Sequence, residues 1–338
     1  MIERENFAMW RGIQEQPKLL RAQADHWAEA ATRIRAEAPK RRTPVVLGRG
    51  SSGHACTFAT YLIGLETGRH PVELRPWVAT QAGPRADWSD AIAYAYSASG
   101  SSTDVSLAAR WLGERGAHVI AVTNAEGEKK ALEIACHQSM RLRAGPERAV
   151  PATKSFCAQL FGAAALAGRE VKAPAKDAAQ CMEELLRKDA AAALAEFLSG
   201  SRQIIWLARG LALAAALDGA LKVQETAGLL TLAYSTAEFL HGPVGSVGPE
   251  DRVVILDDGD EASDTHQAVV ASLVARRTPV VTVGSVPIRA TLSVPLPAET
   301  WARVPVLAML TQQVALELAL RLGLDPDAPA GLKKVTLT

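Results

Sequence analysis

A chain of 338 residues is longer than a single hydrophobic core comfortably supports, so we expect two domains of roughly 150 residues each. Its 37 basic and 36 acidic residues leave a formal net charge of +1, which gives no electrostatic reason to expect nucleic acid or an acidic membrane surface as a partner. The N-terminus is charged and lacks the apolar core of a signal peptide, and apolar runs such as 211–217 are too short to cross a bilayer. We therefore expect a cytoplasmic protein.

The four cysteines are scattered along the chain without a Cys-x-x-Cys pair. This spacing is typical of reduced core residues and not of a disulfide framework or a zinc site. We expect neither a metal nor an organic cofactor. The cysteines are Cys56, Cys136, Cys157 and Cys181.

The first half of the chain alternates between helical and strand patterns. Residues 14–38 are rich in Ala, Arg, Glu and Leu and predict one or two amphipathic helices. Beyond them, uninterrupted apolar strands alternate with helices, which is typical of a parallel sheet covered on both faces. The expected elements are strands at 44–48, 91–95 and 118–123 and helices at 54–65 and 105–113.

The same pattern returns in the second half. Gly210 follows an apolar run as Gly50 does, and strands at 253–256 and 280–283 repeat those at 92–95 and 119–122. The offset in residue number is nearly the same for all three pairs, and such a constant spacing predicts a duplicated α/β domain, with the helical segment 172–198 as its connector. Two doubly wound domains bind ligands at the carboxyl ends of their strands, where we expect a cleft.

The segment 96–104 reads Tyr-Ser-Ala-Ser-Gly-Ser-Ser-Thr-Asp and joins a strand to a helix. A strand, a hydroxyl-rich glycine turn and a helix together can hold a phosphate, because the turn, the serines and the helix N-terminus all offer hydrogen-bond donors. The alternative is an ordinary helix cap, which the same residue types also form.

A dinucleotide site is a second alternative. Residues 48–53 have the spacing Gly-x-Gly-x-x-Gly between a strand and a helix, and Glu73 follows Gly53 near the position of a ribose-binding carboxylate. This interpretation leaves the serine loop and the acidic and basic residues of the second half without a role.

Lys222 and Glu225 are three residues apart and share one face of a predicted helix. A carboxylate there can move a proton between two sugar carbons, with the ammonium beside the developing enolate oxygen. His241, before Gly242 and Pro243, can donate a proton that opens a sugar ring near neutral pH. The alternatives are a surface ion pair and a histidine that caps a helix.

The run Asp257-Asp258-Gly259-Asp260 resembles the start of a calcium loop but lacks the remaining ligand positions, so we expect a solvated turn. His266 begins the helix that follows and is expected to be exposed.

Taken in this order, the motifs resemble the double-SIS (sugar isomerase) family, and in particular the isomerase half of glutamine–fructose-6-phosphate amidotransferase. The resemblance covers essentially the whole chain. It rests on Gly48–Ser52, Ser97–Gly100, Glu147–Lys154, Lys222–Glu225, Glu238–Pro243 and the tail Leu332–Thr336.

The resemblance implies an α/β protein with two doubly wound parallel-sheet SIS domains, flavodoxin-like sandwiches related by internal duplication. It implies a homodimer in which His241 of one subunit completes the site that contains Glu225 of the other. The expected parts are N-terminal helices at 1–40, SIS domains at 41–168 and 199–325, a connector at 169–198 and a C-terminal tail at 326–338.

The amidotransferase begins with a glutaminase domain whose catalytic cysteine follows the initiator methionine. Here residue 2 is Ile, and we expect no such domain. The chemistry is then expected to resemble that of stand-alone SIS-type glucosamine-6-phosphate deaminases. Two alternatives stay open: another phosphosugar isomerase or fructosamine-6-phosphate deglycase, and a non-catalytic sugar-phosphate sensor.

The resemblance also implies roles for single residues. Ala98 and Ala152 depart from the family, which has Gln and Ser there, and Lys333 stands beside the expected catalytic lysine of the tail. The implied catalytic residues are Glu225, His241, Lys222 and Lys334, and the implied sugar- or phosphate-binding residues are Ser51, Ser52, Ser97, Ser99, Gly100, Ser102, Val150 and Ala152.

Overall fold

A computed structural model of the chain describes residues 3–83, 85–188, 190–259, 263–284 and 291–334. The chain forms two compact units, each assembled from segments that are distant in sequence. The sheet-A unit comprises Leu19–Glu147, Lys154–Ala175 and Lys333–Thr338, and the sheet-B unit comprises Met1–Lys18, Arg148–Thr153 and Lys176–Leu332. The domains expected from the sequence are continuous stretches of chain, whereas each compact unit combines separated stretches. The expected domain limits therefore stay a prediction.

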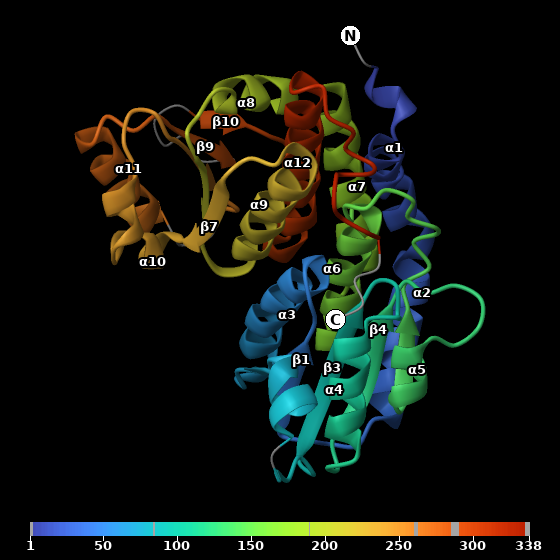
Figure 1. Cartoon of the computed structure of the whole chain (residues 1–338). Helices are drawn as coiled ribbons and strands as arrows, with labels where there is room; N and C mark the ends of the chain where they lie inside the picture. The colour runs from blue at the N-terminus through green and yellow to red at the C-terminus, as the bar shows by residue number, and fades with distance from the viewer. Residues whose placement is uncertain (1–2, 84, 189, 260–262, 285–290, 335–338) are drawn as a thin grey trace. The chain divides into compact units, whose positions relative to one another are not determined.

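The sheet-A unit contains a five-stranded parallel sheet in the order β2-β1-β3-β4-β5 among its described residues. Its strands β1, β3 and β4 are labelled in Figure 1. Its strands are β1 (Thr43–Leu47), β2 (Val72–Glu73), β3 (Ala91–Ser97), β4 (His118–Thr123) and β5 (Gln138–Arg141). Its helices are α3 (Ser51–Thr67), η2 (Val78–Ala82), α4 (Thr103–Gly113), α5 (Ala131–Ala135), α6 (Lys154–Ala167) and most of α2 (Gln16–Glu37).

Both faces of sheet A are buried, as expected for uninterrupted apolar strands. Val45, Val46 and Leu47 of β1 are all 0% exposed. On one face, Val105 of α4 belongs to the same buried cluster as Val45. Elsewhere in the unit, Trp27 of α2 lies with its ring centroid 5.6 Å from that of a phenylalanine of α6. Helices therefore cover this sheet as the doubly wound fold requires.

The sheet-B unit contains a second five-stranded parallel sheet in the order β10-β9-β8-β6-β7 among its described residues. Its strands are β6 (Ile204–Ala208), β7 (Thr231–Ser235), β8 (Arg252–Leu256), β9 (Val280–Gly284) and β10 (Thr291–Ser293). Its helical segments are η1 (Arg4–Asn6), α1 (Ala8–Gln14), α8 (Ala190–Leu198), η3 (Gly210–Ala212), α9 (Leu213–Ala227), α10 (Thr236–Leu240), η4 (Pro243–Ser246), α11 (Ser263–Ala275), α12 (Thr300–Arg321) and most of α7 (Lys172–Arg187).

The two sheets have one topology, which confirms the duplicated doubly wound fold predicted from the sequence. Numbered along the chain within each unit, both sheets have the strand order 2-1-3-4-5, the flavodoxin-like order. The pairing register repeats as well. Pro44 pairs with Ile92 in sheet A, and Ile205 pairs with Val253 in sheet B. The distance along the chain from Pro44 to Ile205 equals the distance from Ile92 to Val253. In such a sheet the strand order reverses between the first and third strands, and ligands bind beside their carboxyl ends.

Helix α12 is a core helix of the sheet-B unit. Among the described residues it is long and apolar enough to cross a membrane by length and composition alone. Because 83% of its most apolar stretch is buried inside the structure, its apolar character is explained by packing.

All four cysteines are free thiols. Burial raises the pKa of Cys136 to about 12 and that of Cys181 to about 11, and it also raises the pKa of Cys56 and Cys157. These thiols therefore stay protonated at neutral pH and are poor nucleophiles.

The expectation of a solvated acidic turn after β8 was wrong. Asp257 and Asp258 are each only 2% exposed, and His266 of α11 is 1% exposed. Asp257 accepts the N–H of Gly259 at 3.0 Å, and the guanidinium of Arg303 donates to the backbone oxygen of Asp258. Long-range contacts thus bury groups that local sequence assigns to solvent; Asp260 lies outside the described residues.

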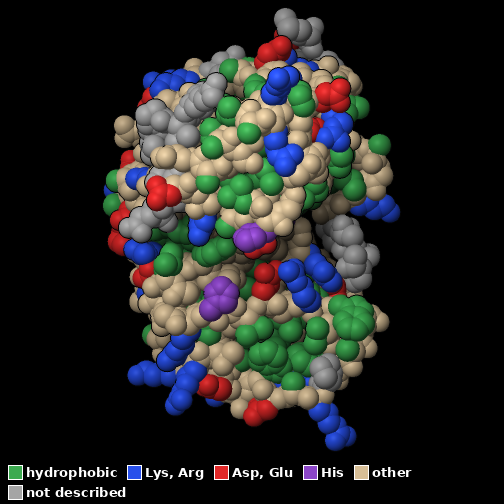
Figure 2. All heavy atoms as spheres, turned by 90° about the vertical axis from the view of Figure 1, so that its left-hand side faces the viewer, with side chains coloured by type: hydrophobic (Ala, Val, Ile, Leu, Met, Phe, Trp, Pro, Cys, Tyr) green, Lys and Arg blue, Asp and Glu red, His purple; other side chains and the backbone are tan. Residues whose placement is uncertain are grey.

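On the face shown in Figure 2, Lys and Arg side chains are interspersed with Asp and Glu side chains. This distribution agrees with the near-neutral charge of the sequence.

Candidate active site

The serine-rich turn after β3, which we call the hydroxyl loop (97–102), lies at the carboxyl end of sheet A. Ser97 is 5% exposed, and its backbone oxygen accepts the N–H of Gly100 at 3.1 Å. Gly100 has a φ of +65°, and a Cβ there would come within 2.9 Å of the Thr123 hydroxyl oxygen. Because the N–H of Gly100 is used within the turn, Gly100 contributes the shape of the loop and leaves the serines as donors.

The end of the hydroxyl loop begins helix α4, but not by a side-chain cap. Ser102 is the N-cap residue in an extended conformation, and its hydroxyl makes no capping hydrogen bond. Its backbone oxygen accepts the hydroxyl of Ser106 at 2.7 Å, and the Ser99 hydroxyl accepts the N–H of Ser101 at 3.2 Å. The first-turn N–H groups of α4 therefore receive no acceptor from Ser102, which favours the anion-binding interpretation over an ordinary cap.

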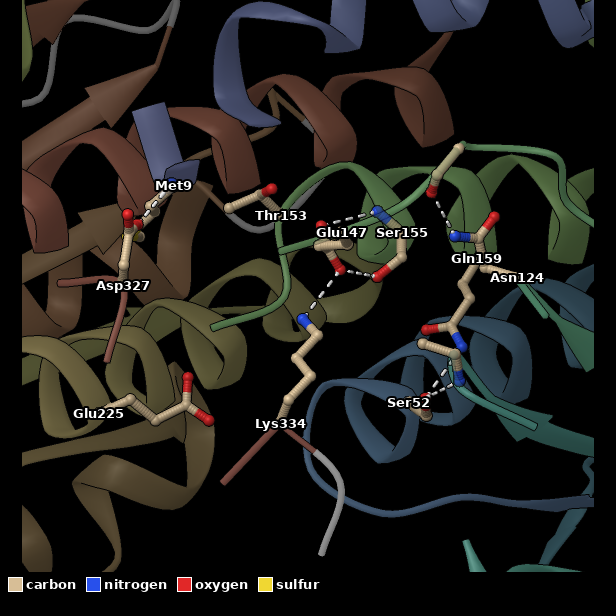
Figure 3. A network of polar contacts seen from close by, with 12 residues as sticks. Met9, Ser52, Asn124, Glu147, Thr153, Ser155, Gln159, Glu225, Asp327 and Lys334 are labelled. Atoms are coloured by element: carbon tan, nitrogen blue, oxygen red, sulfur yellow. Dashed lines mark hydrogen bonds and ion pairs between the residues drawn. The ribbon is translucent and has the colours of Figure 1, made fainter. Parts of the chain in front are cut away.

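The glycine turn after β1 meets the hydroxyl loop through Ser52. Its hydroxyl oxygen accepts the N–H of Ala98 at 3.3 Å and the side-chain amide of Gln159, from α6, at 2.9 Å (Figure 3). Gly48 is required here, because a Cβ would come within 2.7 Å of the backbone oxygen of Ser52. Ser51, the first residue of α3, is half-buried beside it.

An ion pair joins the same two turns. The Nε of Arg49 donates to Oδ2 of Asp104 in the first turn of α4 at 2.8 Å, and a second guanidinium nitrogen donates to the same oxygen. Thr80 donates its hydroxyl to the other carboxylate oxygen of Asp104 at 3.3 Å. Asp104 is 7% exposed, so these donors compensate a nearly buried charge at the start of α4.

The expected C-terminal lysine is held by a carboxylate of the sheet-A unit. Lys334 places its Nζ 3.6 Å from Oε2 of Glu147 (Figure 3). Ser155, the second residue of α6, donates both its N–H, at 3.2 Å, and its hydroxyl to the Glu147 carboxylate. Glu147 thus combines the start of α6 with the tail in one charged cluster.

The Lys222–Glu225 pair lies on α9 in the sheet-B unit. The ammonium of Lys222 donates to Oε2 of Glu225, as their spacing on the helix predicts. The Lys222 side chain is 0% exposed and that of Glu225 is 20% exposed. The Thr226 hydroxyl shares its one proton between the backbone oxygens of Lys222, at 2.9 Å, and of Ala315 in α12, at 3.0 Å, which fixes this turn of α9 against α12. The pair is therefore not an ordinary surface ion pair.

His241 ends helix α10 and is exposed. Its N–H donates to the backbone oxygen of Glu238 at 3.0 Å, and no hydrogen bond or ion pair joins its ring to another residue in the described part of the chain. The Ser235 hydroxyl accepts the N–H of Glu238 at 3.1 Å and caps the other end of the helix. The helix thus presents the imidazole to solvent.

Val150 and Ala152 lie in the segment 148–153, which belongs to the sheet-B unit. Val150 and Ala152 are both half-buried. Val150 donates its N–H to the backbone oxygen of Asp327 at 2.9 Å. The Asp327 carboxylate in turn accepts the N–H groups at the start of α1, including that of Met9 at 2.7 Å (Figure 3).

The structure therefore brings some of the expected site residues into contact. For the other expected residues, a shared site stays a prediction. Within sheet A the structure joins Ser52 to the hydroxyl loop, and within sheet B it pairs Lys222 with Glu225. Among the described residues, no group of three or more His, Cys, Asp or Glu side chains is arranged to hold a metal ion. Gln159, Asp104 and Glu147 are not among the site residues predicted from the sequence.

Comparison with known proteins identifies related sequences. Residues 39–169 and 197–291 match the SIS domain family. The chain is similar to glutamine–fructose-6-phosphate aminotransferase (isomerizing) from Pyrobaculum aerophilum, with 32% identity over 350 residues that cover 96% of this chain and 56% of that protein. The chain spans about half the length of the curated relatives it matches.

Solved structures that share the fold include the two that follow. The C-terminal domain of glucosamine-fructose-6-phosphate aminotransferase from Francisella tularensis superposes with a TM-score of 0.82 and 20% identity, covering 96% of this chain and 98% of that one. Glucosamine-6-phosphate deaminase from Thermotoga maritima superposes with a TM-score of 0.77 and 20% identity, covering 98% of this chain and 100% of that one.

Proposed function

Because the chain belongs to the SIS domain family, we propose that it is a phosphosugar isomerase of the glucosamine-6-phosphate deaminase type. In this reaction glucosamine 6-phosphate and water give fructose 6-phosphate and ammonia. The proposal is supported by the aminotransferase relative from Pyrobaculum aerophilum and by the fold shared with the deaminase from Thermotoga maritima.

One observation carries the proposal: a fully buried ammonium, Lys222, holds a partly exposed carboxylate, Glu225. Removing a charge from water costs free energy, and pairing offsets only part of this cost. A buried charged pair is therefore better explained by a functional role than by a contribution to stability. A protein that only senses a sugar phosphate needs the hydroxyl loop but not such a pair. A proton-transfer enzyme needs a fixed carboxylate with one face open to its substrate.

The residues suggest a course for the reaction. Ser97, Ser99 and Ser102 bind the phosphate, and His241 protonates the ring oxygen to open the sugar. Glu225 removes the proton from carbon 2, and the resulting enolamine is protonated at carbon 1 to give a ketimine. Water adds to the ketimine carbon and ammonia leaves, so fructose 6-phosphate is formed. Lys222 and Lys334 stabilise the negative charge that develops on oxygen.

The same residues serve isomerisation in either direction, so the nitrogen donor decides between deamination and amination. We propose deamination with water as the co-substrate. Glutamine is then not consumed when the protein is incubated with fructose 6-phosphate, and glutamate formation would contradict this part of the proposal.

The decisive experiment measures ammonia and fructose 6-phosphate after addition of glucosamine 6-phosphate, with epimeric amino-sugar phosphates and fructosamine 6-phosphate in parallel. A second arm measures deuterium uptake from D₂O into fructose 6-phosphate. Ammonia release together with exchange supports the deaminase. Exchange without ammonia release indicates another phosphosugar isomerase, and the absence of both indicates a sensor.

We also propose that the enzyme is cytoplasmic and forms a homodimer in which His241 is donated to the neighbouring subunit's site. The near-neutral charge and the four free thiols support the compartment, and the family resemblance supports the dimer. Co-expression of His241→Ala and Glu225→Gln chains tests the shared site. Mixed dimers regain about a quarter to a half of wild-type activity if the site is shared and none if it is not.

A further inference from the structure

The Ser52 hydroxyl has an unusually constrained set of hydrogen bonds. A serine hydroxyl can accept two hydrogen bonds and donate one. The Ser52 oxygen accepts the backbone N–H of Ala98 at 3.3 Å and the side-chain amide of Gln159 at 2.9 Å. With both acceptor positions used, the one capacity left to this hydroxyl is donation of its proton. Within the described residues, no hydrogen bond is formed in which Ser52 donates its hydroxyl proton.

Gln159 forms one side-chain hydrogen bond among the described residues, and its partner is Ser52. It is 1% exposed, and in the part of the chain described its Oε1 has no hydrogen-bond partner, whereas its Nε2 bonds Ser52. A buried amide that satisfies only one of its two ends is a cost that a leucine or methionine would avoid. The single bond that it makes directs the Ser52 hydroxyl.

We infer that Gln159 is a positioning residue that fixes Ser52 as a hydrogen-bond donor to a phosphate oxygen at the hydroxyl loop. This inference deepens the proposed function and rests on it, because it names the group that the loop recognises. The N–H of Ala98 is already bonded to Ser52, so at this point of the loop the ligand meets the Ser52 proton instead of that amide. Ala98 itself has no side-chain donor, and Ser52 supplies one in its place.

A hydroxyl that can only donate discriminates between ligand protonation states. A phosphate monoester dianion offers three terminal oxygens that only accept, whereas a monoanion offers two such oxygens and a P–O–H that needs an acceptor, which Ser52 is not free to be. The arrangement therefore favours the dianion, the dominant form of a phosphate monoester above its second pKa of about 6. Releasing Ser52 from Gln159 lets the hydroxyl rotate and accept from the monoanion, which weakens this preference.

The test is a double-variant cycle on the affinity for fructose 6-phosphate and for inorganic phosphate, measured by calorimetry at pH 7.5. Ser52→Ala is expected to weaken binding about 10–100-fold, as for loss of a charge-assisted hydrogen bond. Gln159→Leu is expected to weaken it about 3–10-fold in the wild-type background and not at all in the Ser52→Ala background. Leu160→Met, a conservative change at a fully buried neighbouring position of α6, is the matched control.

A pH series separates positioning from general damage to the fold. From pH 5 to pH 7.5, wild-type affinity for fructose 6-phosphate should rise more steeply than that of Gln159→Leu. Gln159→Met, which is closer to glutamine in length, replaces Gln159→Leu if that variant does not fold. Equal slopes, or equal losses on changing Gln159 in both backgrounds, would overturn the inference while phosphate binding by the wild type stands. If the wild type binds neither ligand, the proposed phosphate site falls, and the role of Gln159 with it.

Discussion

Substitution of Glu225 by Gln keeps the shape of the side chain but removes both its charge and its ability to take a proton. The Lys222 ammonium is 0% exposed and stays buried after the change, whereas Glu225 is 20% exposed. Removing one partner of a fully buried pair costs about 3–5 kcal/mol. The glutamine oxygen still accepts one hydrogen bond from Lys222 and water reaches the site, so we expect a loss of about 1–3 kcal/mol in the free energy of unfolding.

The effect on catalysis should be much larger than the effect on folding. Loss of a general base lowers turnover by roughly 10²–10⁴-fold, with little change in substrate affinity. Turnover of glucosamine 6-phosphate is measured by ammonia release at a temperature where urea titration shows the variant to be fully folded. Wild-type enzyme should also exchange the hydrogen on carbon 2 with D₂O, and Glu225→Gln should not.

The control is removal of the buried charge itself. Adding Lys222→Met to Glu225→Gln removes the ammonium that Glu225 paired with, and the same urea titration measures how the stability changes. The double variant should not recover turnover, because the base is still absent and the proposed oxygen-stabilising ammonium is removed with it. Near-normal turnover in Glu225→Gln, or turnover that returns together with stability in the double variant, would reduce Glu225 to a structural partner of Lys222.

Three further changes probe the loops of both sheets. Arg49→Ala leaves the Asp104 carboxylate nearly buried at the start of α4, and calorimetry should show fructose 6-phosphate binding weakened about 3–30-fold and largely restored by adding Asp104→Asn; unchanged affinity would contradict this. Gly100→Ala combines a φ of +65° with a Cβ only 2.9 Å from a threonine oxygen, so urea titration should show a loss of about 1–3 kcal/mol in the free energy of unfolding. The control, Gly127→Ala, has a φ of +69° but open space around its Cβ, and it should lose less. Burial, which outweighs the neighbouring carboxylate, lowers the pKa of His266, so the unfolded state takes up its proton first and stability falls as pH drops below about 6.5. His266→Asn should flatten the dependence of stability on pH between 7 and 5, and an unchanged slope would contradict that origin.

The central strands were predictable because their signal is local. Strands β1, β3, β6 and β8 each lie between two neighbouring strands, and most of their residues are apolar and buried. The repeat of these runs predicted the duplication, and the alternation of strands with helices predicted parallel sheets covered on both faces.

The edge strands were not predicted. β2 has only two residues, both exposed, and β5 (Gln138–Arg141) is mostly polar. An edge strand pairs on one side only and can remain short and polar, so it leaves no apolar run in the sequence. The strands that complete both sheets were therefore invisible to a search for hydrophobic patterns.

The candidate site was predictable where neighbours in sequence are also neighbours in space. The hydroxyl loop and the Lys222–Glu225 pair are of this kind. Gln159 was missed because its partner, Ser52, lies 107 residues away, and Asp104 was missed because Arg49 lies 55 residues away. A buried glutamine in an apolar helix was the one available signal, and it does not identify a partner.

The two copies of the fold differ at the carboxyl ends of their corresponding strands, β3 and β8. At the carboxyl end of β3 the chain has the hydroxyl loop, whereas the corresponding end of β8 has Asp257 and Asp258, both 2% exposed. A phosphate brought to those carboxylates would meet like charge in a poorly solvated place, and burial lowers the pKa of His266, so its imidazole supplies no full positive charge to offset it. The carboxyl end of β8 is therefore a poor place for a phosphate, and the hydroxyl loop of sheet A is the phosphate site that we propose. The proposed contribution of the second copy is the Lys222–Glu225 pair of α9.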